Sequence, residues 1–125
     1  MTTQKISSLT KEQFLKLSDT QEIEQVMFES LNTSVFIRAI SASERDAFEA
    51  SCMAGKGKNR GVNMENVRAR LLVKSICDET GKRLFADHEA DALGNMPAKI
   101  ADKLFSVAQK LSGLSPADVE EIAGN

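Results

Sequence analysis

A cysteine, two carboxylates and the only histidine of the chain lie within about a dozen residues of one another: Cys77, Asp78, Glu79 and His88. A nucleophilic cysteine needs an imidazolium or a helix N-terminus to stabilise its thiolate. The apolar segment before Cys77 is expected to be helical, so the cysteine would lie at the negative end of a helix and beside two acids. Both effects raise a thiol pKa. We therefore interpret Cys77 as a buried structural residue.

The histidine does not complete a recognisable metal site. His88 has no cysteine or second histidine at a zinc spacing. The nearby acids lack the alternation and the terminal glutamate of an EF-hand calcium loop. We interpret His88 as a first-turn helix residue among solvated acids that suit the positive helix N-terminus. The sequence thus predicts no catalytic residue, no metal and no cofactor.

A glycine-rich basic stretch, GKGKNRG at residues 55–61, invites a phosphate-binding interpretation. A P-loop, however, ends in a Lys-Ser/Thr pair that opens a helix after a strand, and that pair is missing here. We interpret the stretch as a solvated connection between two helices. A basic patch along the following helix leaves a small nucleic-acid-binding regulator as an alternative function, although no aromatic residue is interleaved with it. Its residues are Arg60, Arg68, Arg70 and Lys74.

The composition matches an ordinary soluble domain, with 125 residues of which 42% are hydrophobic and 27% charged. The 16 basic and 18 acidic residues nearly balance, so no strong field draws the molecule to nucleic acid or anionic lipid. No signal peptide is visible, and no apolar run approaches the roughly 20 residues that span a bilayer. Cys52 and Cys77 lie outside any C-x-x-C spacing. We expect two buried thiols in a reducing cytoplasm, away from membranes.

The length suits one core, so residues 21–125 are expected to form a single domain behind an N-terminal arm of residues 1–20. In the arm, Thr10 and Gln13 have the spacing of a capping box and predict a short helix. The apolar residues that this helix is expected to bury are Phe14, Leu15 and Leu17.

Residues 22–40 predict a β-hairpin, because β-branched and aromatic residues flank a polar break at residues 32–34. A two-stranded ribbon is marginally stable alone, so it must pack on helices or pair with another copy. Alternation places on one face Val26 and Phe28 of the first strand, and Val35, Ile37 and Ala39 of the second.

Two longer helices are expected next. Ser41 and Glu44 have capping-box spacing and start a helix that should end near Gly55. Asn63 is the expected cap of a second helix, which should continue to a turn at Gly81. The inward residues are Ala47, Phe48 and Cys52 in the first helix, and Met64, Val67, Leu71, Leu72 and Ile76 in the second.

Shorter helical segments complete the chain. Asp87 is expected to cap a helix that ends at Gly94, and Pro97 to start an amphipathic helix that ends at Gly113. Ser115 and Pro116 then start a last short helix. The predicted fold class is α+β, mainly α, with an N-terminal β-hairpin followed by about four to five helices. The stripe of the amphipathic helix is Ile100, Leu104, Val107, Ala108 and Leu111.

Five segments carry a resemblance: VFIRAI at 35–40, SASERDAFE at 41–49, RARL at 68–71, CDETGKRLF at 77–85 and LSGLSPADVEE at 111–121. Their order and spacing resemble the tail assembly chaperones of long-tailed bacteriophages. The resemblance implies a non-enzymatic protein that binds the tape measure protein and helps to recruit tail tube subunits. It also implies action in the host cytoplasm, with no place in the mature virion. A structural tail or head–tail completion protein, retained in the virion, is the alternative.

The resemblance also implies that CDETGKRLF is a turn, with Gly81 at a positive φ and Leu84 and Phe85 anchoring the chain to the core. A chaperone of a long apolar client needs exposed apolar surface and many copies, so a homo-oligomer is expected. The hairpin and the last helix are the elements least obviously buried. The candidate partner-binding residues are therefore Phe36, Leu114, Val119 and Ile122.

Overall fold

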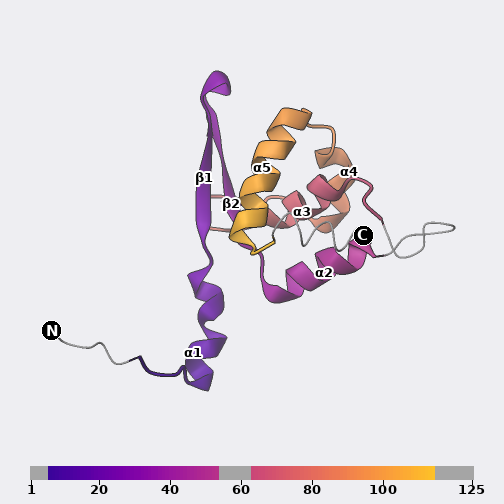
Figure 1. The fold of residues 1–125 in the computed structure, drawn as a ribbon. Coiled ribbons are helices and arrows are strands. Elements are labelled where there is room, and N and C mark those ends of the chain that lie inside the picture. The colour runs from indigo at the N-terminus through magenta and orange to yellow at the C-terminus, as the bar shows by residue number, and fades with distance from the viewer. Residues whose placement is uncertain (1–5, 54–62, 115–125) are drawn as a thin grey trace.

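An N-terminal hairpin followed by helices makes up the computed structural model, which describes residues 6–53 and 63–114 (Figure 1). The predicted α+β, mainly α fold class is confirmed. The Gly-rich loop and the last predicted helix lie outside the described residues. The helices are α1 (Lys11–Leu15), α2 (Ala42–Cys52), α3 (Val67–Ser75), α4 (Ala90–Leu93) and α5 (Ala98–Leu111). The strands are β1 (Ile23–Phe28), β2 (Thr33–Arg38) and β3 (Ile76–Cys77), and the 3-10 helices are η1 (Leu17–Thr20), η2 (Glu29–Leu31) and η4 (Asp87–Glu89).

The hairpin pairs β1 with β2 in an antiparallel register that runs from Ile23 opposite Arg38 to Phe28 opposite Thr33. Val26, Phe28 and Ile37 are buried, which confirms the predicted inward face. The connection between the two strands lies earlier in the chain than expected, because it is formed by η2 and Asn32. Asn32 takes the left-handed conformation, with φ 50°, so that β2 already begins at Thr33.

The sheet has a third strand that the sequence did not predict. β3 pairs with β2 through Cys77 opposite Phe36 and Ile76 opposite Ile37. The prediction that a helix continues through Ile76 is therefore wrong: α3 ends at Ser75, and Ile76 is extended. Ile76 would be buried in a helix as well as in a strand. Its contact with the core residues of the hairpin favours the strand.

The start of α3 also differs from the expected start at Asn63. The Asn63 side chain accepts a hydrogen bond from the Glu65 amide and makes a local turn. Asn66 then takes a left-handed conformation, and its side-chain amide donates to the Ala90 carbonyl. This long-range contact places the helix start at Val67, next to α4.

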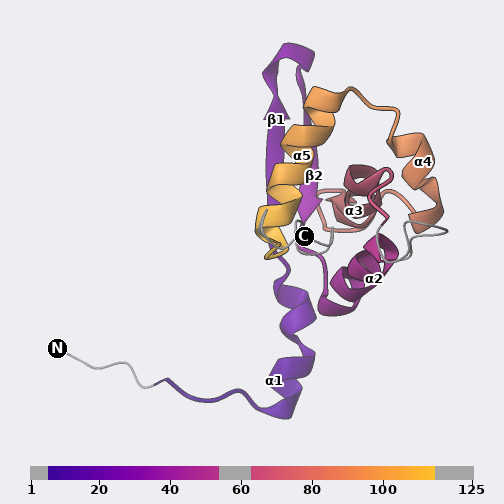
Figure 2. The same ribbon diagram turned by 45° about the vertical axis from the view of Figure 1, so that its right-hand side comes forward.

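Helices α2 to α5 lie on one side of the sheet, with α5 along the hairpin and α4 beyond α3 (Figure 2). The predicted Ser41–Glu44 capping box of α2 is present. Phe48 and Cys52 of that helix are buried, but Ala47 is exposed, because it borders an open pocket beside Arg70, Val73 and Lys74 of α3. The predicted stripe of α5 faces the core, with Leu104 and Ala108 fully buried and Ile100, Val107 and Leu111 packed around them.

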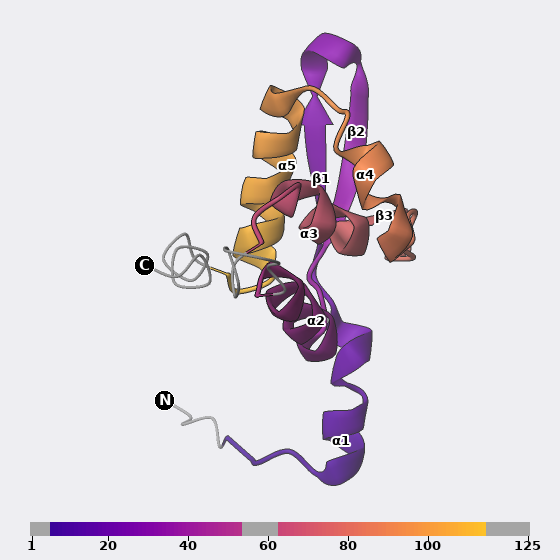
Figure 3. The ribbon, with the colours of Figure 1, turned by 90° about the vertical axis from the view of Figure 1, so that its right-hand side faces the viewer.

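The arm has its predicted capping box at Thr10 but buries nothing. Phe14 and Leu15 are 60% and 71% exposed, so the prediction that they pack inward is wrong. The reason is their position: α1 extends past the end of the hairpin, away from the helices (Figure 3). Within the described ranges, no helix is long and apolar enough to cross a membrane.

Candidate functional site

An open apolar groove of about 580 Å³ lies beside the edge of β2. Val35 and Phe36 form its sheet side, and Leu84 and Phe85 come from the loop after β3. Leu93, Met96 and Leu104 close the helical side, while Asp78 and Glu79 are the two charged residues of the lining. A groove of this size and lining suits an apolar side-chain cluster of a partner. We call it the apolar groove.

The groove is open because the chain turns away from β2 after only two residues of β3. The Asp78 carboxylate accepts hydrogen bonds from the Thr80 amide at 2.8 Å, the Thr80 hydroxyl at 2.6 Å and the Lys82 amide at 3.0 Å. The hydrogen bond from Thr80 is the main reason that the pKa of Asp78 lies below its ordinary value. Gly81 completes the turn at φ 91°, as predicted. This turn ends the pairing with β2 at Cys77.

The open edge presents backbone groups to the groove. The Ala39 amide donates to the Glu22 carbonyl across the hairpin, so the N–H of Ala39 points toward β1. The direction of the backbone N–H and C=O groups alternates from residue to residue along an antiparallel strand. The backbone groups of Val35 therefore point toward β1, and those of Ser34 point toward the opposite edge of β2. There, Ser34 has no strand partner among the residues that the structure describes. The groove therefore combines an apolar lining with a free strand edge.

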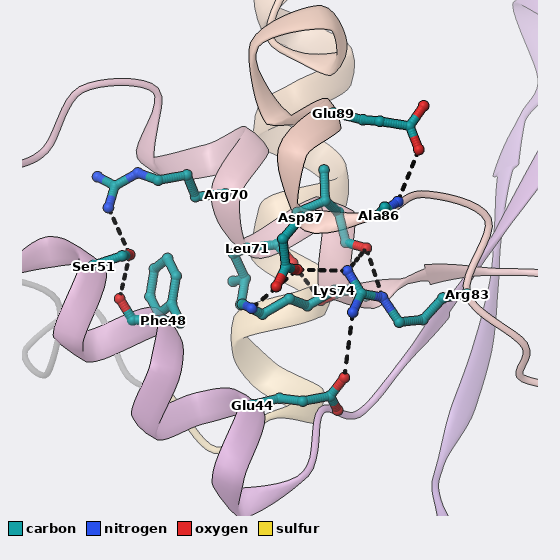
Figure 4. Close-up of polar contacts among 12 residues, drawn as sticks. Glu44, Phe48, Ser51, Arg70, Leu71, Lys74, Arg83, Ala86, Asp87 and Glu89 are labelled. Carbon is teal, nitrogen blue, oxygen red and sulfur yellow. Dashed lines mark hydrogen bonds and ion pairs between the residues drawn. The ribbon is translucent and has the colours of Figure 1, made fainter.

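Ion pairs hold the loop wall of the groove (Figure 4). The guanidinium of Arg83 donates to the Val73 carbonyl at 3.1 and 2.9 Å and to the Asp87 carboxylate at 2.7 Å. Lys74 donates to the same carboxylate at 3.1 Å. The hydrogen bond from Arg83 is the largest cause of the lowered pKa of Asp87. Arg83 and Asp87 flank Leu84 and Phe85, so these contacts position the groove wall.

The same ion pairs overturn one prediction and extend to β2. Asp87 does not cap a helix, because its carboxylate is bound to Arg83 and Lys74. Glu44 of α2 pairs with Arg38 at 2.6 Å and approaches Arg83 at 4.0 Å. Burial raises the pKa of Glu44, but the hydrogen bonds from Arg38 and Ser41 outweigh burial and leave it below its ordinary value.

The structure places Cys77 in the sheet and His88 at the surface. Cys77 is buried in β3, and burial is the main cause of its raised thiol pKa; Asp78 adds to the increase and Arg38 opposes it. A raised pKa disfavours the thiolate that a nucleophile needs. His88 is exposed on η4, and no group of residues in the described part of the chain could hold a metal ion.

The predicted basic patch does not form a shared surface. Arg68 pairs with Asp102 at 2.7 Å, and Lys74 is buried against Asp87. Arg70 points back into the protein, where it donates to the Ser51 hydroxyl at 2.7 Å. Arg60 lies outside the described residues. The three described cations thus bind three different partners.

Of the candidate partner-binding residues, Phe36 lines the apolar groove. Leu114 is 2% exposed and belongs to the core, so it offers no surface to a partner. Val119 and Ile122 lie outside the described residues. Sequence reasoning missed Leu84, which was expected to anchor the core but is 56% exposed on the groove. Leu84 follows the β-bridge between Cys77 and Arg83, so the chain is extended there. Side chains alternate between two faces in an extended segment, and this alternation could have indicated that Leu84 and Phe85 point to opposite sides.

Comparison with known proteins identifies similar folds and sequences. A family model described as phage tail assembly chaperone matches residues 22–125. The solved structure of the bacteriophage HK97 tail assembly chaperone is similar, with a TM-score of 0.56 and 13% identity. The match covers 81% of this chain and 98% of that one, and at this identity it shows a shared fold. No curated protein matches the sequence.

Proposed function

Because the chain belongs to the phage tail assembly chaperone family, we propose that it assists tail assembly by binding an apolar segment of the tape measure protein. Membership of this family implies a non-enzymatic role. The observation that carries the binding proposal is the apolar groove, which the described chain leaves open. Apolar grooves of this kind accept the anchoring side chains of helical or extended segments.

The proposal includes the other steps of that role. The protein acts in the host cytoplasm, helps to bring tail tube subunits to the bound tape measure protein, and leaves before the virion is complete. Mass spectrometry of purified particles tests the last step. Ring-like stoichiometric amounts of this chain in the particles would contradict it and would favour a structural tail or head–tail completion protein.

Co-expression with the tape measure protein of the same phage tests the groove. Leu84 and Leu31 form a matched pair, with exposures of 56% and 57%, but only Leu84 lines the groove. We expect the tape measure protein to stay soluble and to co-purify with the parent chain and with Leu31→Asp. We expect Leu84→Asp to lose both effects, because a carboxylate in an apolar contact is strongly penalised. Equal behaviour of the two variants would contradict the proposal.

A further inference from the structure

The arm contains a specified helix with nothing to pack against. In α1, the Thr10 hydroxyl accepts from the Gln13 amide and the Gln13 side chain accepts from the Thr10 amide, at 3.2 and 2.9 Å. None of its residues is buried, and Phe14 and Leu15 are exposed. An isolated helix of this length is unstable in water, since most helical stability comes from packing an apolar face. The helix therefore needs a surface to dock on.

In the structure, the arm helix lies away from the apolar groove of its own chain. It precedes Ile23, at the end of the hairpin where β1 lies opposite Arg38. Ser34 and Val35 of the groove lie toward the other end, near the connection between the strands. Figures 1 and 3 show the arm continuing away from that end. In this arrangement, a helix that fills the groove belongs to another copy.

Lys11 gives the arm helix one charge opposite to that of the acids in the groove, while Glu12, three residues before Leu15, carries the other sign. Lys11 lies three and four residues before Phe14 and Leu15, so all three share one face of the helix. Asp78 and Glu79 are the two charged residues of the groove lining. Two apolar side chains entering the groove would place the lysine near these acids. The arm precedes residue 22, where the match to the family model begins.

We propose that the helix Lys11–Leu15 of one copy occupies the apolar groove of the next copy, and that the client displaces it. The contact is head to tail, so association continues into open chains or closes into rings. The displacement step rests on the proposed function, whereas the contact between copies stands without it.

Two variants separate the two halves of this contact. The arm variant carries Phe14→Ser and Leu15→Ser, and the groove variant carries Leu84→Asp; all three positions are exposed, so both chains should fold. We expect the parent chain to show a mass that rises with concentration in sedimentation velocity, and each variant to remain monomeric. In an equimolar mixture, the intact arm of the groove variant can bind the intact groove of the arm variant. This single contact should give a heterodimer that grows no further, because neither chain offers a second intact contact. The control Leu31→Asp should associate like the parent.

A labelled peptide of residues 6–20 gives a direct measurement. It should bind the arm variant, whose groove is free, and should bind about tenfold or more weakly when Leu84→Asp is added, since burial of two apolar side chains is lost. Lys11→Glu in the peptide should weaken binding by about twofold to fivefold, as an exposed ion pair does, and Glu79→Lys in the protein should restore it. Absence of peptide binding, a monomeric parent or a monomeric mixture would overturn the proposal.

The two proposals fail in different ways. If the inference holds, the arm variant loses self-association but binds the tape measure protein at least as tightly as the parent. If the arm variant still self-associates while Leu84→Asp loses the client, the inference is wrong and the proposed function stands. If copies associate through the arm but the client binds the parent and Leu84→Asp equally, the groove is a self-association site alone.

Discussion

At the scale of single residues, polar side chains near the apolar groove shape it through hydrogen bonds and ion pairs. Asp78 ends β3 by accepting three hydrogen bonds, and this leaves the edge of β2 open. Arg83 and Asp87 hold the two ends of the segment that carries Leu84 and Phe85. These residues therefore set the position of the groove wall.

Cys77 is expected to contribute stability and no reactivity. Cys77→Ser buries a hydroxyl in β3, so it should lower the free energy of unfolding by about 1–3 kcal/mol while client binding survives. Urea unfolding and client co-purification measure the two quantities. A variant of unchanged stability that no longer bound the client would contradict the structural role.

The ion pairs predict a loss of stability in acid. Asp87 and Glu44 have pKa values below their ordinary 3.8 and 4.5 in the folded protein. A lowered carboxyl pKa adds stability above the unfolded pKa, and that stability is lost as the pH falls through the folded pKa. The free energy of unfolding should therefore fall between about pH 5 and pH 3. Urea unfolding at a series of pH values measures it.

The variant Asp87→Asn should show a shallower fall over this range, because it lacks one of the three carboxylates whose pKa is lowered, the third being Asp78. Asp91→Asn is the control, since Asp91 is exposed and has no ion pair in the described part of the chain. An equal slope in parent and Asp87→Asn would show that Asp87 contributes nothing to the acid response.

At the scale of elements, the chain carries the same capping device in two settings. Ser41 starts α2, which buries Phe48 and Cys52, and Thr10 starts α1, which buries nothing. Ser41→Ala should lower the free energy of unfolding by about 1 kcal/mol, the usual value of an N-cap. Thr10→Ala should leave it unchanged but weaken the association between copies. Thermal unfolding and sedimentation velocity measure the two effects, and a destabilised Thr10→Ala would mean that the arm folds with the domain.

At the scale of the whole molecule, the exposed apolar surface predicts self-association. Phe36→Asp should shift oligomers toward monomers, because it places a carboxylate in the apolar groove. Met27→Asp is the control, since Met27 is exposed on the same hairpin but outside the groove. Light scattering over a wide concentration range measures the mass. An unchanged mass of folded Phe36→Asp would place the contact elsewhere.

Local sequence determined the parts of the fold whose interactions are local. The capping boxes at Thr10 and Ser41, the hairpin with its inward Val26, Phe28 and Ile37, and the positive φ of Gly81 were all predictable. Each depends on residues close in the chain or on a periodicity that one strand or helix displays by itself. The stripe of α5 was predictable for the same reason, because its 3.6-residue period runs for several turns.

Tertiary structure decided the features that form the apolar groove and expose the arm. A two-residue strand is too short to show a period-two pattern in the sequence. By sequence alone Ile76 fits a helical stripe as well as a strand, and its pairing with Ile37 of β2 decides for the strand. The start of α3 depends on the hydrogen bond from the Asn66 side chain to the carbonyl of Ala90, 24 residues away. The apolar groove exists because β3 ends early and the loop with Leu84 lies beside the β2 edge. The exposure of the arm likewise follows from where the hairpin directs it, since burial requires a surface within reach.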